Sequence, residues 1–344
     1  MQQNHRGKAG FVFPEPPSIT GYAAVVGKKE SEGPLGGWFD IVSKDTSFSQ
    51  KSWESAESEM QRRSLAKAAE KADMGEKMPQ AVFSGDLLNQ CIGSSFALSN
   101  RDIPVLGLYG ACSTMAEALL LSGMAVSSGV CTTAAALTSS HFASAERQYR
   151  FPLAYGGQRT PTAQWTVTGS GCAIVSASGN APYIQGASVG SIVDMGIKDA
   201  NNMGAAMAPA AYQTIRQHFE DFNVAPEDYD LIVTGDLGIH GKQILLELFD
   251  RDGVNLSARY DDCGAMIFDA KAQDVHAGGS GCGCGASVLC GYLLKQVANG
   301  SIKRLLFCGT GAMLSPTSTQ QGKSIPAVCH AVTITAERSA PWTM

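Results

Sequence analysis

The chain has 344 residues, of which 44% are hydrophobic and 17% charged, a composition that allows a large core and argues against disorder. A net charge of −5 and the lack of a Lys/Arg cluster exclude the footprint of a nucleic-acid-binding protein. The ten cysteines are scattered through apolar segments, which favours a reducing compartment over a small secreted disulfide scaffold. We expect neither a signal peptide nor a transmembrane segment, because the polar residues 1–10 and the rest of the chain lack the apolar runs that these need.

In chain order, residues 1–50 are rich in Gly, Pro and Ser and predict irregular structure. The first half then predicts a helix over 52–73, strands over 80–84 and 105–109, a helix over 112–126, an apolar run over 130–137 and a long strand over 165–177. The second half predicts a helix over 206–219, a strand over 230–234, helices over 242–249 and 284–298, and strands over 303–308 and 327–335. This alternation predicts a mostly parallel sheet with helices packed on it.

The strongest sign of organisation is an internal repeat. The segment 82–87 (VFSGDL) resembles the segment 232–237 (IVTGDL), 150 positions later. Each copy ends a predicted strand with a glycine and an aspartate, Asp86 in the first and Asp236 in the second. A Cys/Gly-rich turn, a helix and another apolar strand follow each copy. This order predicts two duplicated αβ units that face each other, with both Gly-Asp turns near a pseudo-twofold axis.

Three motifs carry a resemblance to the thiolase and β-ketoacyl synthase superfamily. Gly110-Ala111-Cys112-Ser113-Thr114 resembles its nucleophile turn, the segment 278–287 resembles the thiolase turn that ends in Gly-Ala-Ser, and Gly309-Thr310-Gly311 resembles the final glycine triplet. The resemblance implies an α/β fold of two duplicated subdomains in a five-layer αβαβα architecture. Residues 1–190 would form the half that carries Cys112, and residues 191–344 the half that carries the glycine-rich turn.

The bases of that superfamily are missing from the matching positions. Condensation on a cysteine needs a group that takes the thiol proton. By resemblance, the position of the thiolase histidine holds Cys282, that of the β-ketoacyl synthase histidine holds Gly235 or Asp236, and that of the second thiolase cysteine holds Phe307. We therefore expect a binding protein and not an enzyme. The alternative is an enzyme that condenses acyl-CoA or acyl-carrier substrates on Cys112 with an unrecognised base.

A narrower resemblance extends over most of the chain, from about Gly33 to His330. It is carried by eight segments: Gly85–Gln90, Gly110–Thr114, Thr138–His141, Ala143–Tyr149, Thr168–Gly171, Met207–Ala211, Thr234–Leu237 and Asp261–Gly264. These segments resemble the stage V sporulation protein AD family, whose members have the thiolase fold.

That resemblance implies non-catalytic binding of dipicolinic acid, pyridine-2,6-dicarboxylate, for its uptake into the developing spore. It implies no cofactor, although calcium could accompany the ligand. The implied partners are integral membrane proteins of the same transport system, and the implied location is the forespore or spore, peripheral on the inner spore membrane. Thiolase-fold proteins usually pair through the strand that precedes the cysteine helix, so a homodimer is implied as well.

Cys112 and Ser113 open a predicted helix, where exposed N–H groups and the helix dipole favour anions and lower the pKa of a thiol. We therefore place both residues in a ligand-binding pocket, together with Cys282 from the glycine-rich turn. The alternative for Cys112 is a small buried residue at a tight turn, since nine other cysteines occur in the chain.

The two repeated aspartates are further candidates. Asp86, with its neighbour Asn89, and Asp236 would border the pocket and contact the ligand or an associated calcium ion. The alternative is a turn aspartate that caps the next helix. We favour this alternative for Asp236, and for Asp86 we give the ligand-binding and capping interpretations equal weight. His141, at the end of an apolar run, could donate to a ligand carboxylate, although a histidine satisfied at a strand end is commoner.

Three other groups of residues receive weaker interpretations. Three arginines lie around Gly156-Gly157: Arg147, Arg150 and Arg159. They could shape the pocket entrance or pair across a dimer, but the default interpretation is that their charges are solvated at the surface. Cys282-Gly283-Cys284, Cys290 and His276 do not have the spacing of a zinc site, so we predict no metal site. Asp261-Asp262 is interpreted as a surface turn.

Overall fold

The computed structural model describes residues 4–149 and 159–338. The strands are β1 (His5–Arg6), β2 (Gly10–Val12), β3 (Ser18–Val26), β4 (Ile41–Val42), β5 (Ala81–Gly85), β6 (Val105–Gly107), β7 (Thr133–Ser140), β8 (Trp165–Thr166), β9 (Gly169–Ser176), β10 (Tyr183–Ser188), β11 (Leu231–Thr234), β12 (Tyr260–Asp262), β13 (Gly279–Ser280), β14 (Arg304–Ala312) and β15 (Ala327–Thr335). The α-helices are α1 (Lys28–Ser31), α2 (Trp53–Lys71), α3 (Ile92–Leu98), α4 (Thr114–Ser127), α5 (Phe142–Tyr149), α6 (Met203–Phe222), α7 (Gly238–Arg251), α8 (Cys263–Met266), α9 (Cys282–Val288), α10 (Leu294–Ala298) and α11 (Pro316–Gln320). Short 3₁₀ turns include η2 (Asn89–Cys91) and η3 (Ala111–Ser113), and a π-helical segment, η6 (Leu289–Leu293), joins α9 to α10.

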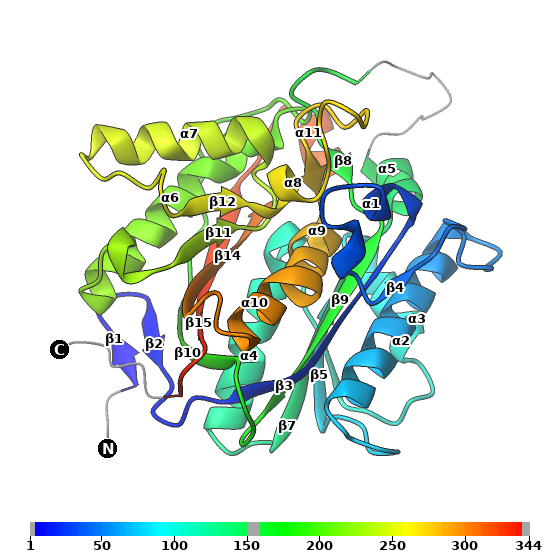
Figure 1. Cartoon of the computed structure of the whole chain (residues 1–344). Coiled ribbons are helices and arrows are strands. Elements are labelled where there is room, and N and C mark those ends of the chain that lie inside the picture. The colour runs from blue at the N-terminus through cyan, green and yellow to red at the C-terminus, as the bar shows by residue number, and fades with distance from the viewer. Residues whose placement is uncertain (1–3, 150–158, 339–344) are drawn as a thin grey trace.

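These elements form the five layers that the resemblance implies (Figure 1). Helices α2 and α3 cover one half of the sheet, and α6 and α7 cover the other half. Between the two halves lie α4 and the continuous helix α9–η6–α10. No helix in the two described ranges has the length and apolar composition needed to cross a bilayer.

The sheet topology reproduces the internal repeat. Its strand order is β12-β11-β14-β15-β10-β3-β9-β7-β5-β6. From the junction of β10 with β3, one half runs β10-β15-β14-β11-β12 and the other β3-β9-β7-β5-β6, so the motif-bearing strands β11 and β5 hold equivalent places. The inner strands of each half pair antiparallel and the outer strands parallel. The sheet is therefore mixed, and the expectation of a mostly parallel sheet is wrong.

Two local expectations are also wrong. Residues 18–26 form β3 in the middle of the sheet and not irregular structure; because the strand is buried on both faces, it shows no polar alternation. Gly21 lets α2 pack closely on β3, since a Cβ there would lie 2.2 Å from the Ala68 carbonyl oxygen. The long strand expected over 165–177 is two strands, because β8 leaves the main sheet and pairs with β13.

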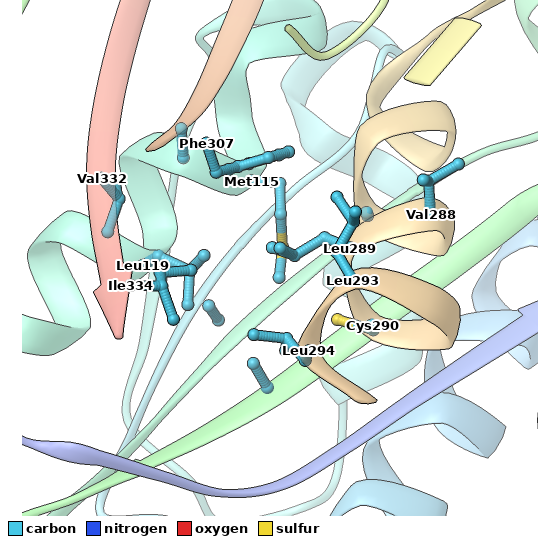
Figure 2. Close-up of a cluster of buried hydrophobic side chains, with 14 of the residues drawn as sticks. Met115, Leu119, Val288, Leu289, Cys290, Leu293, Leu294, Phe307, Val332 and Ile334 are labelled. Atoms are coloured by element: carbon cyan, nitrogen blue, oxygen red, sulfur yellow. The ribbon is translucent and has the colours of Figure 1, made fainter. Parts of the chain in front are cut away.

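The central layer is held by apolar packing (Figure 2). Met115 and Leu119 of α4 belong to one buried cluster with Leu289 and Leu293 of η6 and with Phe307 of β14. Burying each such side chain stabilises the fold by roughly 1.5–3 kcal/mol. This packing fixes the amino-terminal end of α9 against η3, the turn that carries Cys112.

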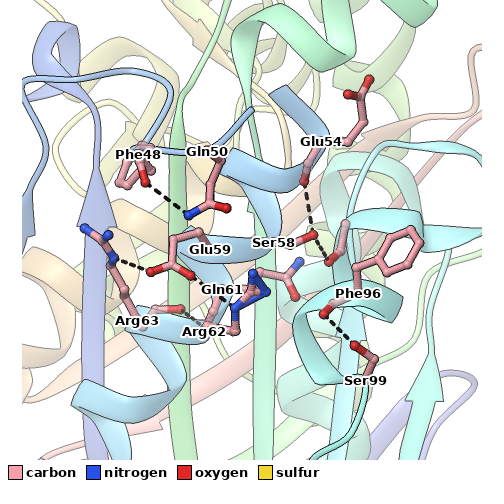
Figure 3. Close-up of polar contacts among 12 residues, drawn as sticks. Phe48, Gln50, Glu54, Ser58, Glu59, Gln61, Arg62, Arg63, Phe96 and Ser99 are labelled. Atoms are coloured by element: carbon pink, nitrogen blue, oxygen red, sulfur yellow. Dashed lines mark hydrogen bonds and ion pairs between the residues drawn. The ribbon is translucent and has the colours of Figure 1, made fainter. Parts of the chain in front are cut away.

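The predicted helix over 52–73 is confirmed as α2. Ser52 caps it by accepting a hydrogen bond from the Ser55 N–H at 3.2 Å. Figure 3 shows its polar side chains: Glu59 accepts hydrogen bonds from Arg62 and Arg63, and Ser58 faces α3. The helix therefore buries one side against β3 and β9 and pairs its charges on the other.

Candidate functional site

A pocket lies between the two halves beside the start of α4. It contains about 600 Å³ of space, part of which is open to solvent. Its walls mix apolar side chains with a few polar groups, which is the composition typical of small-molecule sites. The residues that line it are Leu87, Ala111, Cys112, Ala145, Glu146, Tyr149, Thr166, Ala200, Asn201, Met203, Ser280, Ala312 and Leu314.

Cys112 sits on the pocket wall in a turn that needs glycines. Ala111 has the left-handed φ of 50°, and a Cβ on Gly110 would lie 2.5 Å from a carboxylate oxygen of Glu117. Gly311 of β14 approaches the turn from the second half, since a Cβ there would lie 2.4 Å from the Gly110 carbonyl oxygen. Both glycine motifs in the sequence therefore serve to bring β14 against the cysteine turn.

Asp236 does not line the pocket but lies behind Ser280, which does, and is a centre of hydrogen bonding there. Its fully buried carboxylate accepts hydrogen bonds from the Gly281 N–H at 2.9 Å, the Ser280 hydroxyl at 3.1 Å and the Thr310 hydroxyl at 2.8 Å. The Cys112 thiol is close enough to interact with this carboxylate. Burial raises the pKa of Asp236, and these donors oppose the rise. The carboxylate thus joins β11, the glycine-rich turn and β14 to the cysteine.

The same contacts determine the chemistry of the thiol. Burial, the charge of Asp236 and the nearby Cys282 raise the pKa of Cys112 well above its ordinary value, and the Gly281 N–H opposes this rise. The expected lowering of this pKa by the helix amino terminus is therefore wrong, because burial and a carboxylate outweigh the dipole. Cys112 is a thiol at neutral pH, and the thiolate is the form that attacks acyl groups.

The six histidines all lie within the described ranges, and none lines the pocket. His141 bonds to the Thr46 carbonyl oxygen at 2.7 Å and stacks on Trp53. The other hydrogen-bonded histidines have partners elsewhere: His218 with Ser188 and Tyr229, His276 with Thr160, and His330 with Gly190. His5 packs on Phe11, and His240 is exposed on α7. The group that faces the Cys112 thiol is thus a carboxylate.

Asp86 has a capping role. Its buried carboxylate accepts hydrogen bonds from the Leu88 N–H at 2.9 Å and from the Ser94 N–H and hydroxyl, both at 2.7 Å. The carboxyl group of Glu57, on α2, lies beside that of Asp86, and both are next to Gly93. A Cβ on Gly93 would be 3.2 Å from the carboxyl carbon of Asp86 and 3.4 Å from the carboxyl carbon of Glu57. Burial raises the pKa of both carboxyls, and the charge of Asp86 helps to raise that of Glu57 to about 8.

The cap of α7 is a different aspartate from the one predicted. Asp262, not Asp236, accepts hydrogen bonds from the Leu237 and Gly238 N–H groups, each at 2.8 Å. The parallel register of β11 with β12 places Asp262 beside Thr234 at the start of this turn. Asp262 is fully buried, so its interpretation as part of a surface turn is wrong.

The remaining predicted residues are dispersed around the pocket. The Cys282 thiol donates to the Ala111 carbonyl oxygen at 2.9 Å, directly behind the wall, and the Ser113 hydroxyl donates to the Gly110 carbonyl oxygen at 2.6 Å. Asn89 is exposed. Of the seven predicted residues, Cys112 lines the pocket, Asp236 and Cys282 support it, and Asp86, Asn89, Ser113 and His141 do not line it. Contact of any of them with a ligand stays a prediction.

The sequence interpretation missed the wall formed by α5. Ala145, Glu146 and Tyr149 line the pocket, and the Thr166 hydroxyl donates to the Glu146 carboxylate at 3.3 Å. The signal was present, because Ala145 and Tyr149 are four residues apart and share a helix face in one of the segments that carries the narrower resemblance.

Of the three arginines singled out in the sequence, two lie within the described residues. Arg150 and Gly156-Gly157 lie outside the described residues, whereas Arg147 pairs with Glu54, and Arg159 with Asp274 at 3.1 Å. Within residues 4–149 and 159–338, no three His, Cys, Asp or Glu side chains are grouped so as to hold a metal ion.

The fold is shared with condensing enzymes of known structure. The 3-oxoacyl-[acyl-carrier-protein] synthase III of Aquifex aeolicus VF5 matches with a TM-score of 0.55 and 11% identity, over 93% of this chain and 99% of that one. A variant of OleA from Xanthomonas campestris matches with a TM-score of 0.61 and 13% identity, over 94% of this chain and 99% of that one. At these identities the likeness shows the thiolase-type fold alone.

The sequence itself matches a sporulation family. Stage V sporulation protein AD of Bacillus subtilis (strain 168) is 41% identical over 326 residues, which cover 95% of this chain and 96% of that protein. The family described as Stage V sporulation protein AD (SpoVAD) matches residues 7–335. The chain therefore belongs to the stage V sporulation protein AD family.

Proposed function

We propose that this sporulation protein binds dipicolinate in the Cys112 pocket and does not catalyse acyl condensation. The observation that carries the proposal is the buried carboxylate of Asp236 beside the thiol, because it disfavours the thiolate that a condensing enzyme needs. By resemblance, Gly235 or Asp236 holds the position at the end of the strand where β-ketoacyl synthases carry their histidine base.

The composition of the pocket supports a small aromatic ligand. Leu87, Tyr149 and Met203 offer apolar and aromatic surface for a pyridine ring, and the side-chain amide of Asn201 offers a neutral donor for a carboxylate. The Glu146 carboxyl on the same wall would disfavour a bare dianion unless a proton or a metal ion lies between them. We therefore propose that calcium accompanies the ligand, as cargo and not as a resident cofactor.

Calorimetric titration of the purified protein with dipicolinate, with and without calcium, tests this proposal. Benzene-1,3-dicarboxylate, which keeps both carboxylates but lacks the ring nitrogen, is the control ligand. Met203→Trp should fill the pocket and weaken binding at least about tenfold, which corresponds to ~1.4 kcal/mol. Met195→Trp is the matched control, since Met195 is 64% exposed and does not line the pocket. Absence of binding by the wild type, or equal loss in both variants, would refute the proposal.

The second candidate is a condensing enzyme, favoured by the position of Cys112 on the wall of a pocket in a fold shared with such enzymes. It predicts that acyl-CoA acylates Cys112 and that the acyl group then turns over. Mass spectrometry of the Cys112 peptide after incubation with acyl-CoA separates the two candidates, because the binding proposal expects no acyl adduct.

We further propose that the protein acts on the inner membrane of the forespore beside integral membrane proteins of the dipicolinate uptake system. This proposal rests on the family resemblance. Membrane fractionation of sporulating cells, followed by crosslinking, tests it: the protein should sediment with the membrane fraction and be released when its membrane partners are deleted.

A further inference from the structure

The turn that follows β5 carries part of the pocket wall in a strained conformation. Leu87 lines the pocket, and further along the same turn Gln90 and Cys91 both have a left-handed φ, of 56° and 49°. A residue with a Cβ disfavours this conformation, so two in succession persist only where neighbouring contacts hold them. The shape of this turn therefore depends on what surrounds it.

Some of these contacts come from the turn and from β6 beside it. The Asp86 carboxylate accepts a hydrogen bond from the Leu88 N–H at 2.9 Å, and the Cys91 thiol donates to the Leu108 carbonyl oxygen at 3.2 Å. Two backbone groups in the middle of the turn, the Leu87 carbonyl and the Asn89 N–H, are bound instead by side chains of α5.

Gln148 of α5 binds both of these backbone groups. Its side-chain amide donates to the Leu87 carbonyl oxygen at 3.1 Å and accepts from the Asn89 N–H at 3.0 Å. One planar amide thus pairs with a donor and an acceptor of the turn, as an adjacent strand does in a sheet. The Tyr149 hydroxyl also donates to the Leu87 carbonyl oxygen, at 2.5 Å, and the Tyr109 hydroxyl is a more distant donor at 3.3 Å.

The side chain of Gln148 acts from outside the pocket. One apolar cluster on the pocket wall contains Leu87 and Cys112 together with Ala145 and Tyr149 of α5. Gln148 is not among the described residues that line the pocket. It can therefore affect a ligand only through the placement of the turn and of the wall that the turn carries.

We propose that Gln148 is a positioning residue that holds the strained turn 87–91 against α5 and so fixes Leu87 in the place that ligand binding needs. Without this amide the turn relaxes from its left-handed conformation, and Leu87 leaves its place beside Cys112. The contact uses the backbone of Asn89 and not its side chain. The part of this proposal that concerns affinity rests on the function proposed above.

Hydrogen exchange of the full chain tests the positioning without any ligand. Gln148→Ala should speed amide exchange in residues 87–91 at least about fivefold, as expected for the loss of two hydrogen bonds. Adding Gln90→Gly should restore the protection, because glycine adopts a left-handed φ without a steric penalty. Glu54→Gln is the matched control, since it frees Arg147, the residue before Gln148, from its ion pair and leaves the turn untouched. Wild-type exchange in Gln148→Ala, or the same acceleration in Glu54→Gln, would overturn the proposal.

Ligand titration and urea unfolding together separate positioning from a merely structural role. Gln148→Ala should bind dipicolinate at least about fivefold more weakly than the wild type. Its unfolding midpoint should stay unchanged, because Tyr149 still donates to the Leu87 carbonyl and water replaces the amide at the exposed Asn89. The double variant Gln148→Ala/Gln90→Gly should bind within about twofold of the wild type.

The outcomes distinguish this proposal from the choice of ligand. If exchange behaves as expected but the wild type does not bind dipicolinate, the proposed ligand is wrong and the positioning role stands. If the wild type binds and Gln148→Ala binds equally well, the positioning role is wrong and the ligand stands. A loss of binding that comes with a lower unfolding midpoint and is not restored by Gln90→Gly would show that Gln148 only stabilises the fold.

Discussion

The carboxylate of Asp236 lies close to the thiol of Cys112 across the boundary between the two halves of the fold, and its charge raises the pKa of that thiol. Asp236→Asn removes the negative charge and should lower the pKa of Cys112. Because each unit of pKa changes the thiolate fraction about tenfold, iodoacetamide should alkylate Cys112 correspondingly faster at pH 8. Peptide mass spectrometry measures the rate, and Asp261→Asn is the control. Equal rates in wild type and Asp236→Asn would show that Asp236 does not keep the thiol protonated.

A second prediction concerns the pH dependence of stability. The pKa of Glu57 is raised from 4.5 to about 8, so between these values the folded protein holds a proton that the unfolded chain has released. Stability must therefore fall as pH rises through this window. Glu57→Gln removes that contribution, which is on the order of a few kcal/mol for a fully buried carboxyl.

Urea unfolding at pH 6 and pH 9 measures this effect. The loss of stability between the two pH values should be smaller in Glu57→Gln than in the wild type. Glu59→Gln is the matched control on the same helix, because Glu59 pairs with Arg62 and Arg63 near the surface. A wild-type slope retained in Glu57→Gln would assign the pH dependence to other buried carboxyls, such as Glu30 and Asp262, whose pKa values are each about 7.

A third prediction follows from the close approach of Gly311 to the cysteine turn. In Gly311→Ala the new Cβ would lie 2.4 Å from the Gly110 carbonyl oxygen, a backbone atom that cannot rotate away. We expect a loss of about 1–3 kcal/mol in the free energy of unfolding and weaker ligand binding. In Gly37→Ala, where nothing lies within 4 Å of the new Cβ, the change should be within about 0.5 kcal/mol. Chemical denaturation of both variants checks the difference.

A fourth prediction distinguishes two adjacent aspartates. Asp262→Ala leaves the Leu237 and Gly238 N–H groups at the start of α7 without their acceptor, and should cost about 1–3 kcal/mol. Asp261→Ala breaks a partly exposed pair with Lys242 and should cost less than about 1 kcal/mol. The free energy of unfolding of each variant is the measurement. Equal costs would contradict the assignment of Asp262 as the cap of α7.

The repeat in the sequence was sufficient to predict the symmetry of the sheet, because a Gly-Asp turn at the end of a strand depends on local sequence. It was not sufficient to predict what the two aspartates do. Asp86 caps its own turn, whereas Asp236 is turned toward the cysteine because Asp262 already satisfies the N–H groups that follow β11. That difference comes from the neighbouring strand β12, which no local pattern reveals.

The pocket was predictable only in part for the same reason. Cys112 could be placed from its motif, but the α5 wall and Ser280 come from segments brought together by packing between the halves. The central strand β3 was missed because a strand that is covered on both faces lacks the alternation of polar and apolar residues that identifies a surface strand.

The contact between Gly110 and Gly311 has an evolutionary consequence. A Cβ at residue 311 would meet the backbone carbonyl oxygen of residue 110, which every residue carries, so no substitution at 110 could make room for a side chain at 311. The second half of this duplicated protein therefore cannot diverge from glycine at that point. Sequences of relatives should vary at the outer helices, while residue 311 remains glycine.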